Sequence, residues 1–290
     1  MTQTEASPRG VALLLPAKAA ALTGSAEVLR ALPRRQQRRV GPFVFFDHFG
    51  PHRPLAGAMA HAMDVPPHPH VGLQTVSYLF SGAIEHRDSL GSVQVIRPGD
   101  VNWMTAGPAI THMETVVPGS EGLHGIQTWV ALPRPQRKMQ PAFEHFAAAA
   151  LPMLEFPGAQ VRIIAGALGE RRSPVPDLVP LTYLDLNLQA GTELALSVPP
   201  EHELALYVAS GEVTLGGTVV PRGVLALLGE AGGMVHLGSA PGARAALFGG
   251  VPLPEPTVIW WNFIVDSVEE GRACEADWKA GRFPRVPGFE

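Results

Sequence analysis

Short runs of apolar and β-branched residues, separated by turn-forming residues, fill the chain between residues 74 and 132. No 3.6-residue helical period connects these runs, and most of them end at a glycine, proline or serine cluster. Such a pattern predicts the short strands of an antiparallel sandwich or barrel. The predicted strands are 74–80, 83–88, 93–96, 101–105, 110–117 and 123–132.

A weaker copy of this pattern follows in the second half of the chain. Residues 78–82 (YLFSG) resemble residues 207–211 (YVASG), and in both copies a strand and a Pro/Gly turn come next. The following apolar run begins at Val101 in the first copy and covers residues 224–228 in the second. Self-similarity on this scale predicts a duplicated domain.

The segment 133–138 (PRPQRK) marks the link between the two copies. We expect an N-terminal domain at residues 1–135 and a C-terminal domain at residues 136–290. Residues 267–270 (SVEE) fit a capping box, which predicts a short C-terminal helix through Trp278. The expected fold class is therefore all-β, with two tandem domains, each an antiparallel sandwich or barrel, and one helix near the end of the chain.

The composition agrees with a folded, turn-rich protein. The 290 residues include 31 Gly and 29 Pro, and only 17% are charged. Without a repeat period or low complexity, this Gly and Pro content indicates many turns rather than disorder. The net charge of -4 gives no reason to expect direct binding of nucleic acid.

The single cysteine, Cys274, excludes an intrachain disulfide and a thiolate-rich metal site, and it fits a reducing compartment. The apolar run at residues 11–15 is too short to span a bilayer and lacks the basic flank of a signal peptide. We therefore expect a soluble cytoplasmic protein that does not bind membranes.

Four potential metal ligands fall in two pairs, His68 with His70 and His112 with Glu114. Side chains two residues apart on a strand point to the same face, so each pair can aim both members at one point. If the two strands face each other, three imidazoles and one carboxylate form a single pocket. Iron, manganese, nickel, copper and zinc favour that donor set. The pattern predicts a metal site with vacant positions, in which Glu114 either binds the metal or orients an imidazole.

Nine of the eleven histidines lie before residue 150, and the second half holds only His202 and His236, so we expect that half to be a metal-free scaffold. Motifs for a serine nucleophile elbow, a Cys-x-x-Cys redox pair and a dinucleotide-binding loop are absent from the sequence. The remaining histidines of the first half are expected to be structural: His48, His52, His61, His86, His124 and His145.

The surroundings of the four candidate ligands resemble the pirin family of the cupin superfamily. The resembling segments are 41–50 (GPFVFFDHFG), 66–70 (PPHPH), 75–79 (TVSYL), 98–100 (PGD), 103–107 (WMTAG), 110–114 (ITHME) and 124–130 (HGIQTWV). The resemblance implies two tandem cupin domains, each an antiparallel β-barrel (jelly-roll), with one mononuclear metal site in the first only. It also implies His68, His70, His112 and Glu114 as the ligands of one divalent ion. We expect Fe2+ first, with Ni, Mn, Cu or Zn also compatible with the donor set.

Two further positions are candidates for supporting the ligands from outside the set: Gln74, and His48, which is structural by default. Gln74 stands where cupins usually carry a glutamate, which affects the tuning of the site more than metal binding. His48 lies in the resembling segment 41–50. The segment 260–263 (WWNF) departs from the tail of the best-known pirins, which suggests a bacterial sub-branch with a different substrate.

The family is associated with quercetin 2,3-dioxygenase activity. The resemblance therefore implies a metal-dependent dioxygenase that cleaves a flavonol ring, with a small aromatic substrate and O2 as its partners. The metal would act as a Lewis acid on the 3-hydroxyl, and Glu114 is the candidate catalytic base. Residues 43–49 and Met104 are candidate walls of the substrate site.

The leading alternative is a non-enzymatic regulator, because eukaryotic pirins are linked to transcription-factor complexes. In this reading, the oxidation state of the metal changes a surface that binds a transcription-related protein partner. The chain has little basic character, and its composition is rich in Ala, Gly, Pro and Arg. Both features count against a nuclear role. A third reading is a vestigial enzyme with low turnover that serves in stress response.

Overall fold

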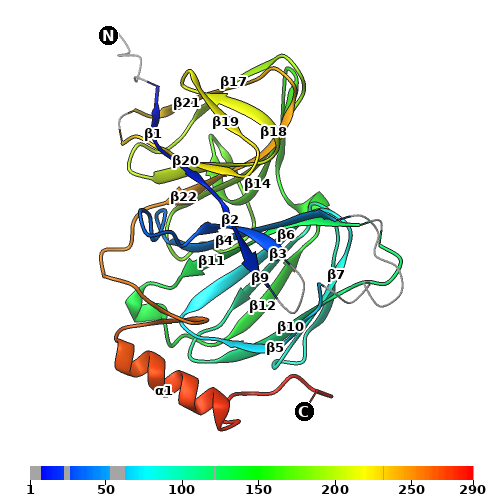
Figure 1. The fold of residues 1–290 in the computed structure, drawn as a ribbon, viewed down its shortest axis with the longest axis vertical. Coiled ribbons are helices and arrows are strands. Elements are labelled where there is room, and N and C mark those ends of the chain that lie inside the picture. The colour runs from blue at the N-terminus through cyan, green and yellow to red at the C-terminus, as the bar shows by residue number, and fades with distance from the viewer. Residues whose placement is uncertain (1–7, 23–26, 53–62, 121, 231, 290) are drawn as a thin grey trace. The chain divides into compact units, whose positions relative to one another are not determined.

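A computed structural model of the chain describes residues 8–22, 27–52, 63–120, 122–230 and 232–289. Strands dominate this part of the chain, and one α-helix lies near its end (Figure 1). The residues form two compact units, neither of which is continuous in sequence. Unit 1 comprises residues 1–17, 34–42 and 149–252, and unit 2 comprises residues 18–33, 43–148 and 253–290.

Unit 2 contains two antiparallel sheets. The larger sheet has the order β12 (Ala142–Phe146), β9 (Val101–Thr105), β6 (Leu73–Ser81), β11 (Leu123–Ala131), β4 (Phe43–His52), β3 (Glu27–Leu32) and β2 (Lys18–Ala21). The smaller sheet has the order β5 (Val65–His70), β10 (Ile110–Val116), β7 (Ile84–Asp88) and β8 (Val93–Ile96). The strands predicted between residues 74 and 132 are confirmed as β6 to β11, with ends that differ by one residue at most.

The burial of β6 fits its place inside the larger sheet, between β9 and β11. Every residue from Leu73 to Leu79 is buried, which is expected of a strand whose two faces are both covered. The apolar side chains of one face, including Leu79 and Phe49, pack with Ile84 and Ile96 of the smaller sheet. This apolar cluster holds the two sheets of unit 2 together.

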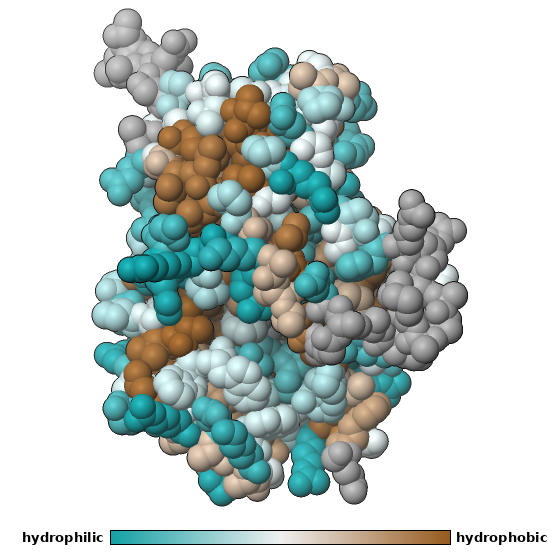
Figure 2. Space-filling model, viewed as in Figure 1, coloured by the Kyte–Doolittle hydropathy of each residue, from teal (hydrophilic) through white to brown (hydrophobic). Residues whose placement is uncertain are grey.

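Unit 1 is built from a second antiparallel assembly. Its main path is β1 (Val11–Pro16), β20 (Val224–Leu228), β18 (Glu203–Leu215), β22 (Ala243–Gly250), β16 (Leu181–Leu188), β14 (Ala159–Leu168) and β13 (Met153–Phe156). The strands off this path are β15 (Arg171–Arg172), β17 (Thr192–Ser197), β19 (Thr218–Pro221) and β21 (Met234–Ser239). The interior is a continuous cluster of aliphatic side chains such as Ile163, Leu184 and Leu247. Figure 2 shows apolar residues at the surface over β1, where Leu13 and Leu14 are partly exposed.

The predicted sequence repeat corresponds to a repeated strand pairing. In unit 2, Tyr78 of β6 pairs with Val101 of β9. In unit 1, Tyr207 of β18 pairs with Leu225 of β20. In both units, the strand that follows the Pro/Gly turn pairs with the strand that carries a fully buried tyrosine. The YLFSG and YVASG segments therefore hold equivalent places in the two units.

The C-terminal residues belong to unit 2. The hairpin of β23 (Val258–Trp260) and β24 (Phe263–Val265) leads into α1 (Val268–Lys279). The Glu270 N–H donates to Ser267 Oγ at 3.1 Å, which confirms the predicted N-cap of the helix. Phe263 packs with Val71, next to the end of β5.

The domain boundary near residue 135 stays a prediction. In the described part of the chain, no helix has the length and apolar character needed to cross a membrane.

Gly72 allows the β23–β24 hairpin to lie against the end of β5. Its φ is +69°, and a Cβ at this position would lie 2.1 Å from the carbonyl oxygen of Ile264. The Ile264 N–H donates to the carbonyl of Val71 at 2.9 Å, so the two backbones are joined at this point. A side chain at position 72 therefore forces the hairpin away from the end of β5.

We expect Gly72→Ala to lower the free energy of unfolding by about 2 kcal/mol or more, because left-handed strain and a backbone clash add together. Urea unfolding measures the effect. Gly119→Ala is the matched control, because Gly119 has a φ of +79° but nothing within 4 Å of its added Cβ. Equal losses in the two variants would show that the contact with Ile264 contributes nothing.

Candidate metal centre

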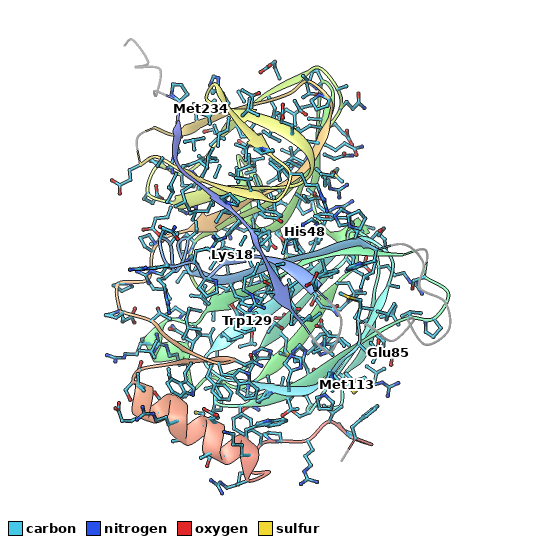
Figure 3. The ribbon with its side chains drawn as sticks, in the orientation of Figure 1. Lys18, His48, Glu85, Met113, Trp129 and Met234 are labelled. Carbon is cyan, nitrogen blue, oxygen red and sulfur yellow. The ribbon has the colours of Figure 1, made fainter. Side chains whose placement is uncertain are left out.

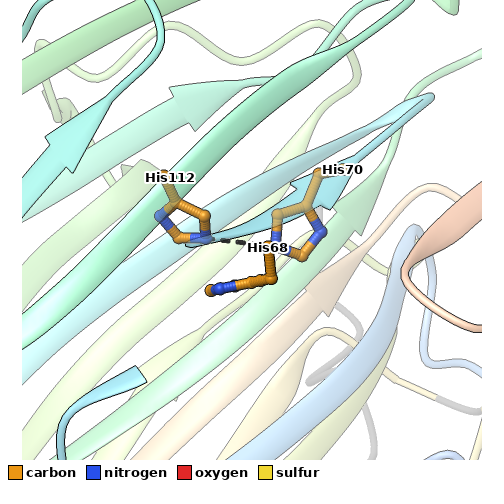
Figure 4. A group of neighbouring side chains, drawn as sticks. All are labelled: His68, His70 and His112. Atoms are coloured by element: carbon orange, nitrogen blue, oxygen red, sulfur yellow. Dashed lines mark hydrogen bonds between the residues drawn. The ribbon is translucent and has the colours of Figure 1, made fainter. Parts of the chain in front are cut away.

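The antiparallel pairing of β5 and β10 brings the two ligand pairs of the sequence together. His112 lies opposite His68, and Ile110 lies opposite His70. The side chains of His68, His70 and His112 converge, and one ligating atom of each lies within 4.8 Å of the others (Figure 4). The structure therefore places the three histidines as the strand spacing predicts.

These three imidazoles are neutral at pH 7. Burial lowers the pKa of His70 and His112 well below the ordinary value, and the neighbouring imidazoles lower it further. Burial also lowers the pKa of His68. Each neutral ring carries one N–H and one nitrogen with a free lone pair.

Backbone carbonyls decide which nitrogen carries the proton in two of the rings. The Nδ1 atom of His68 lies 2.9 Å from the carbonyl oxygen of Pro66. The Nδ1 atom of His70 lies 3.2 Å from the carbonyl oxygen of Asn262, in the turn between β23 and β24. A carbonyl oxygen only accepts, so each Nδ1 must donate. The Nε2 atoms of His68 and His70 therefore keep their lone pairs.

The spacing of the imidazole nitrogens fits a metal ion. The Nε2 atoms of His70 and His112 lie 3.1 Å apart. When two nitrogens each lie about 2.0–2.1 Å from one ion, and the N–metal–N angle is that of square or tetrahedral coordination, the nitrogens are about 3 Å apart. Buried neutral imidazoles are the donors that borderline divalent metals prefer. The residues present thus suit a divalent cation.

Glu114 reaches the same region with its carboxylate held from the larger sheet. Ser77 Oγ donates to its Oε1 at 2.8 Å, and Gln127 Nε2 donates to its Oε2 at 3.0 Å. The side chain is buried and shares a cavity wall with His68. Each carboxylate oxygen has a further lone pair, which is available to a metal or a proton.

His86 lies closer to the cluster than the sequence suggested. The sequence predicts a structural role for His86, and in the fold this residue pairs with Glu114 across β7 and β10. Ligating atoms of His86, His112 and Glu114 all lie within 4.8 Å of one another. A signal was present in the sequence, because His86 and Asp88 have the same i, i+2 spacing as the two ligand pairs.

The two positions expected to support the ligands make other contacts. Gln74 Nε2 donates to Thr105 Oγ1 at 2.9 Å. His48 Nε2 lies 2.8 Å from His124 Nε2. Neither bond reaches an imidazole of the cluster, and a supporting role for either residue stays a prediction. His61 lies outside the described residues.

A cavity of about 480 Å³ opens beside the cluster, with His68 and Glu114 in its wall. Trp129, which is labelled in Figure 3, also lines the cavity. It stacks on Phe45, another lining residue, with ring centroids 4.0 Å apart and planes 13° apart. Trp261 lines the cavity from the C-terminal hairpin. The volume falls within the range of about 300–1,000 Å³ that is usual for small-molecule sites.

A few polar groups complete the lining of this cavity. Arg30 donates through Nε to Asp47 Oδ1 at 2.9 Å and through Nη2 to Asp47 Oδ2 at 2.8 Å. This hydrogen-bonded pair raises the pKa of Arg30, so the guanidinium stays charged. The guanidinium carbon also lies 4.6 Å from the centroid of the Phe45 ring. A flat aromatic wall with a few fixed polar groups is typical of a site for a small aromatic molecule.

Comparison with known proteins identifies one family in both halves of the chain. The pirin profile matches residues 25–130, and the profile of the pirin C-terminal cupin domain matches residues 183–284. A pirin-like protein of Caulobacter vibrioides is 42% identical over 276 residues, which cover 92% of each chain. Pirin of Mus musculus is 33% identical over 272 residues, which cover 91% of this chain and 89% of that protein.

Solved structures lead to the same family. The crystal structure of quercetin 2,3-dioxygenase from Acinetobacter baumannii matches with a TM-score of 0.90 and 34% sequence identity. The match covers 96% of this chain and 92% of that one. The predicted all-β fold with two cupin domains and a C-terminal helix is confirmed. With both cupin domains matched, the chain belongs to the pirin family.

Proposed function

We propose that this pirin is a metal-dependent dioxygenase that opens the ring of a flavonol or a similar enol-bearing aromatic with O2. The observation that carries the proposal is the aromatic-walled cavity that reaches His68 and Glu114. The likeness to the Acinetobacter baumannii quercetin 2,3-dioxygenase supports this class of reaction. One divalent ion would be held by His68, His70, His112 and Glu114. Fe2+ is our first choice, and Ni, Mn, Cu or Zn suit the same donors.

A divalent ion bound there would supply Lewis acidity, which favours ionisation of an enol hydroxyl. Glu114 is the candidate general base that accepts the hydroxyl proton at a carboxylate oxygen. Ser77 and Gln127 donate to that carboxylate and fix its orientation toward the cavity. The base is therefore held in place before the substrate arrives.

The cavity walls would orient a planar substrate. The stacked rings of Phe45 and Trp129 offer a flat surface on which an aromatic ring system can pack. Arg30 and Asp47 lie in the same lining and can exchange hydrogen bonds with phenolic hydroxyl groups. In the net reaction, the flavonol and one O2 give a ring-opened ester and one carbon monoxide.

A direct assay tests this function. Protein loaded with Fe2+ is mixed with quercetin without oxygen, and then oxygen is admitted. We expect a shift of the flavonol absorption on binding, followed by its loss with equal amounts of O2 consumed and carbon monoxide released. Protein stripped of metal by a chelator is the control and should give no turnover. One metal per chain with bound quercetin but no O2 consumption would reject the dioxygenase.

A further inference from the structure

Three buried side chains of unit 2 form a hydrogen-bonded chain that ends at the cluster. Asp88 Oδ2 lies 3.1 Å from His86 Nε2. His86 Nδ1 in turn lies 3.3 Å from His112 Nδ1. Asp88 and His86 come from β7, and His112 comes from the neighbouring strand β10, where it pairs with Asp88. The other nitrogen of His112 faces His70.

The turn between β7 and β8 fixes the Asp88 carboxylate. The backbone N–H groups of Leu90 and Ser92 donate to Asp88 Oδ1 at 2.9 and 3.0 Å. Burial alone would raise the pKa of Asp88, but hydrogen bonds from His86 and Ser92 lower it below its usual value. Asp88 is therefore an anion whose Oδ1 is occupied by two donors and whose Oδ2 faces His86.

The His86 ring is also held in one orientation. It stacks on Phe143 of β12, with ring centroids 4.3 Å apart and planes 15° apart. This stack leaves the two ring nitrogens directed at Asp88 and at His112. Both nitrogens of His86 are thus already used in hydrogen bonds.

The positions of the protons follow from the anion at one end of this chain. A carboxylate accepts and does not donate, so His86 Nε2 carries the proton of its neutral ring. His86 Nδ1 is then an acceptor, and His112 Nδ1 must donate to it. The Nε2 atom of His112 is left with its lone pair, as are those of His68 and His70. Neither ring then donates across the 3.1 Å between the Nε2 atoms of His112 and His70, where two acceptors face each other.

We propose that Asp88 and His86 are positioning residues that set the tautomer and the orientation of His112, so that its Nε2 is free to bind the metal ion. The Nδ1–H groups of His68 and His70 meet backbone carbonyls, whereas that of His112 meets the ring of His86. Partners of this kind fix the tautomer of a metal-binding histidine. The proposal rests on the metal site of the proposed function and not on the dioxygenase reaction.

A competing assignment uses some of the same atoms. His86, His112 and Glu114 are close enough to hold a second ion of their own. The contacts favour the positioning role, because a second ion at His86 has to displace either Asp88 from Nε2 or His112 from Nδ1. The two assignments differ in the number of ions bound per chain.

Asp88→Asn tests the proposal because it reverses the direction of the hydrogen bonds that run from residue 88 through His86 to His112. The Leu90 and Ser92 N–H groups hold the amide oxygen in the place of Oδ1, so the amide N–H2 points at His86 Nε2. His86 then carries its proton on Nδ1, and His112 must carry its own on Nε2, where the metal would bind. We expect the affinity for Zn2+, measured by competition with a chromophoric chelator, to fall about 10–100-fold.

A spectroscopic readout separates this role from a merely structural one. Long-range ¹H–¹⁵N correlation spectra of the full-length, metal-free protein distinguish the two tautomers of each ring. We expect His112 to be protonated on Nδ1 in the wild type and on Nε2 in Asp88→Asn. Glu85→Gln is the matched control: it removes one negative charge from the same strand, and Glu85 pairs with Arg87. This variant should keep the wild-type tautomers and Zn2+ affinity.

His86→Phe provides a second test that keeps the stacking surface on Phe143. It is expected to lose about 10–100-fold in Zn2+ affinity while still binding one ion per chain. Wild-type affinity in both variants, or an unchanged His112 tautomer in Asp88→Asn, would overturn the proposal. Two Zn2+ per wild-type chain, falling to one in His86→Phe, would make His86 a ligand instead. Neither readout involves a flavonol or O2, so this inference and the dioxygenase can fail separately.

Discussion

Replacing His70 with alanine is expected to abolish both metal binding and flavonol turnover. The His70 ring is buried, and its unprotonated Nε2 lies 3.1 Å from Nε2 of His112. Loss of an outer hydrogen-bonding partner costs a metal site about 10–100-fold in affinity, and loss of a ligand removes a metal bond outright. We therefore expect His70→Ala to bind the ion at least about 100-fold more weakly. Elemental analysis of the purified protein and O2 uptake with quercetin measure the two effects.

His145→Ala is the matched control for this variant. His145 is a half-buried histidine of the same unit, and its Nδ1 lies 2.7 Å from Asn102 Oδ1. The substitution removes the same atoms without touching the cluster, so metal content and turnover should stay at wild-type levels. Full turnover by His70→Ala with one metal per chain would contradict both the ligand set and the proposed mechanism.

The sequence predicts much of the fold because its signals are local. Turn-forming residues separate the apolar runs of the first half so regularly that the ends of the six strands from 74 to 132 could be predicted to within one residue. His68 and His70 lie on the same face of β5, as their i, i+2 spacing predicts, because the strand is extended across both residues. The antiparallel pairing of β5 with β10 then places His112 opposite His68.

Other parts of the site depend on contacts that no local pattern carries. The acceptor for His70 Nδ1 is the backbone carbonyl of Asn262, 192 positions away, and every residue type has such a carbonyl. The register between β10 and β5 shifts between His112 and Glu114, where two residues of β10 span three of β5, so the spacing along the sequence does not give the β5 residue that lies opposite Glu114. Ser77 and Gln127, which hold Glu114, come from the other sheet.

The metal-free protein is expected to lose stability steeply as the pH falls below about 6.5, the ordinary pKa of histidine. Burial, followed by repulsion from neighbouring imidazoles, holds the pKa of His70 and His112 well below that value in the folded state. Below about pH 6.5 the unfolded chain binds protons that the folded chain does not, so acid favours unfolding. The free energy of unfolding should fall by up to about 1.4 kcal/mol per pH unit for each of these two histidines.

Urea unfolding of chelator-treated protein, at pH values between about 5 and 7.5, measures this dependence around the ordinary histidine pKa. The double variant His70→Gln/His112→Gln should show a slope smaller by up to about 2.7 kcal/mol per pH unit, which is twice the contribution of one histidine. His236→Gln is the control, because His236 is exposed on β21 and its replacement should leave the slope unchanged. If the double variant kept the wild-type slope, the buried imidazoles could not be the groups that resist protonation.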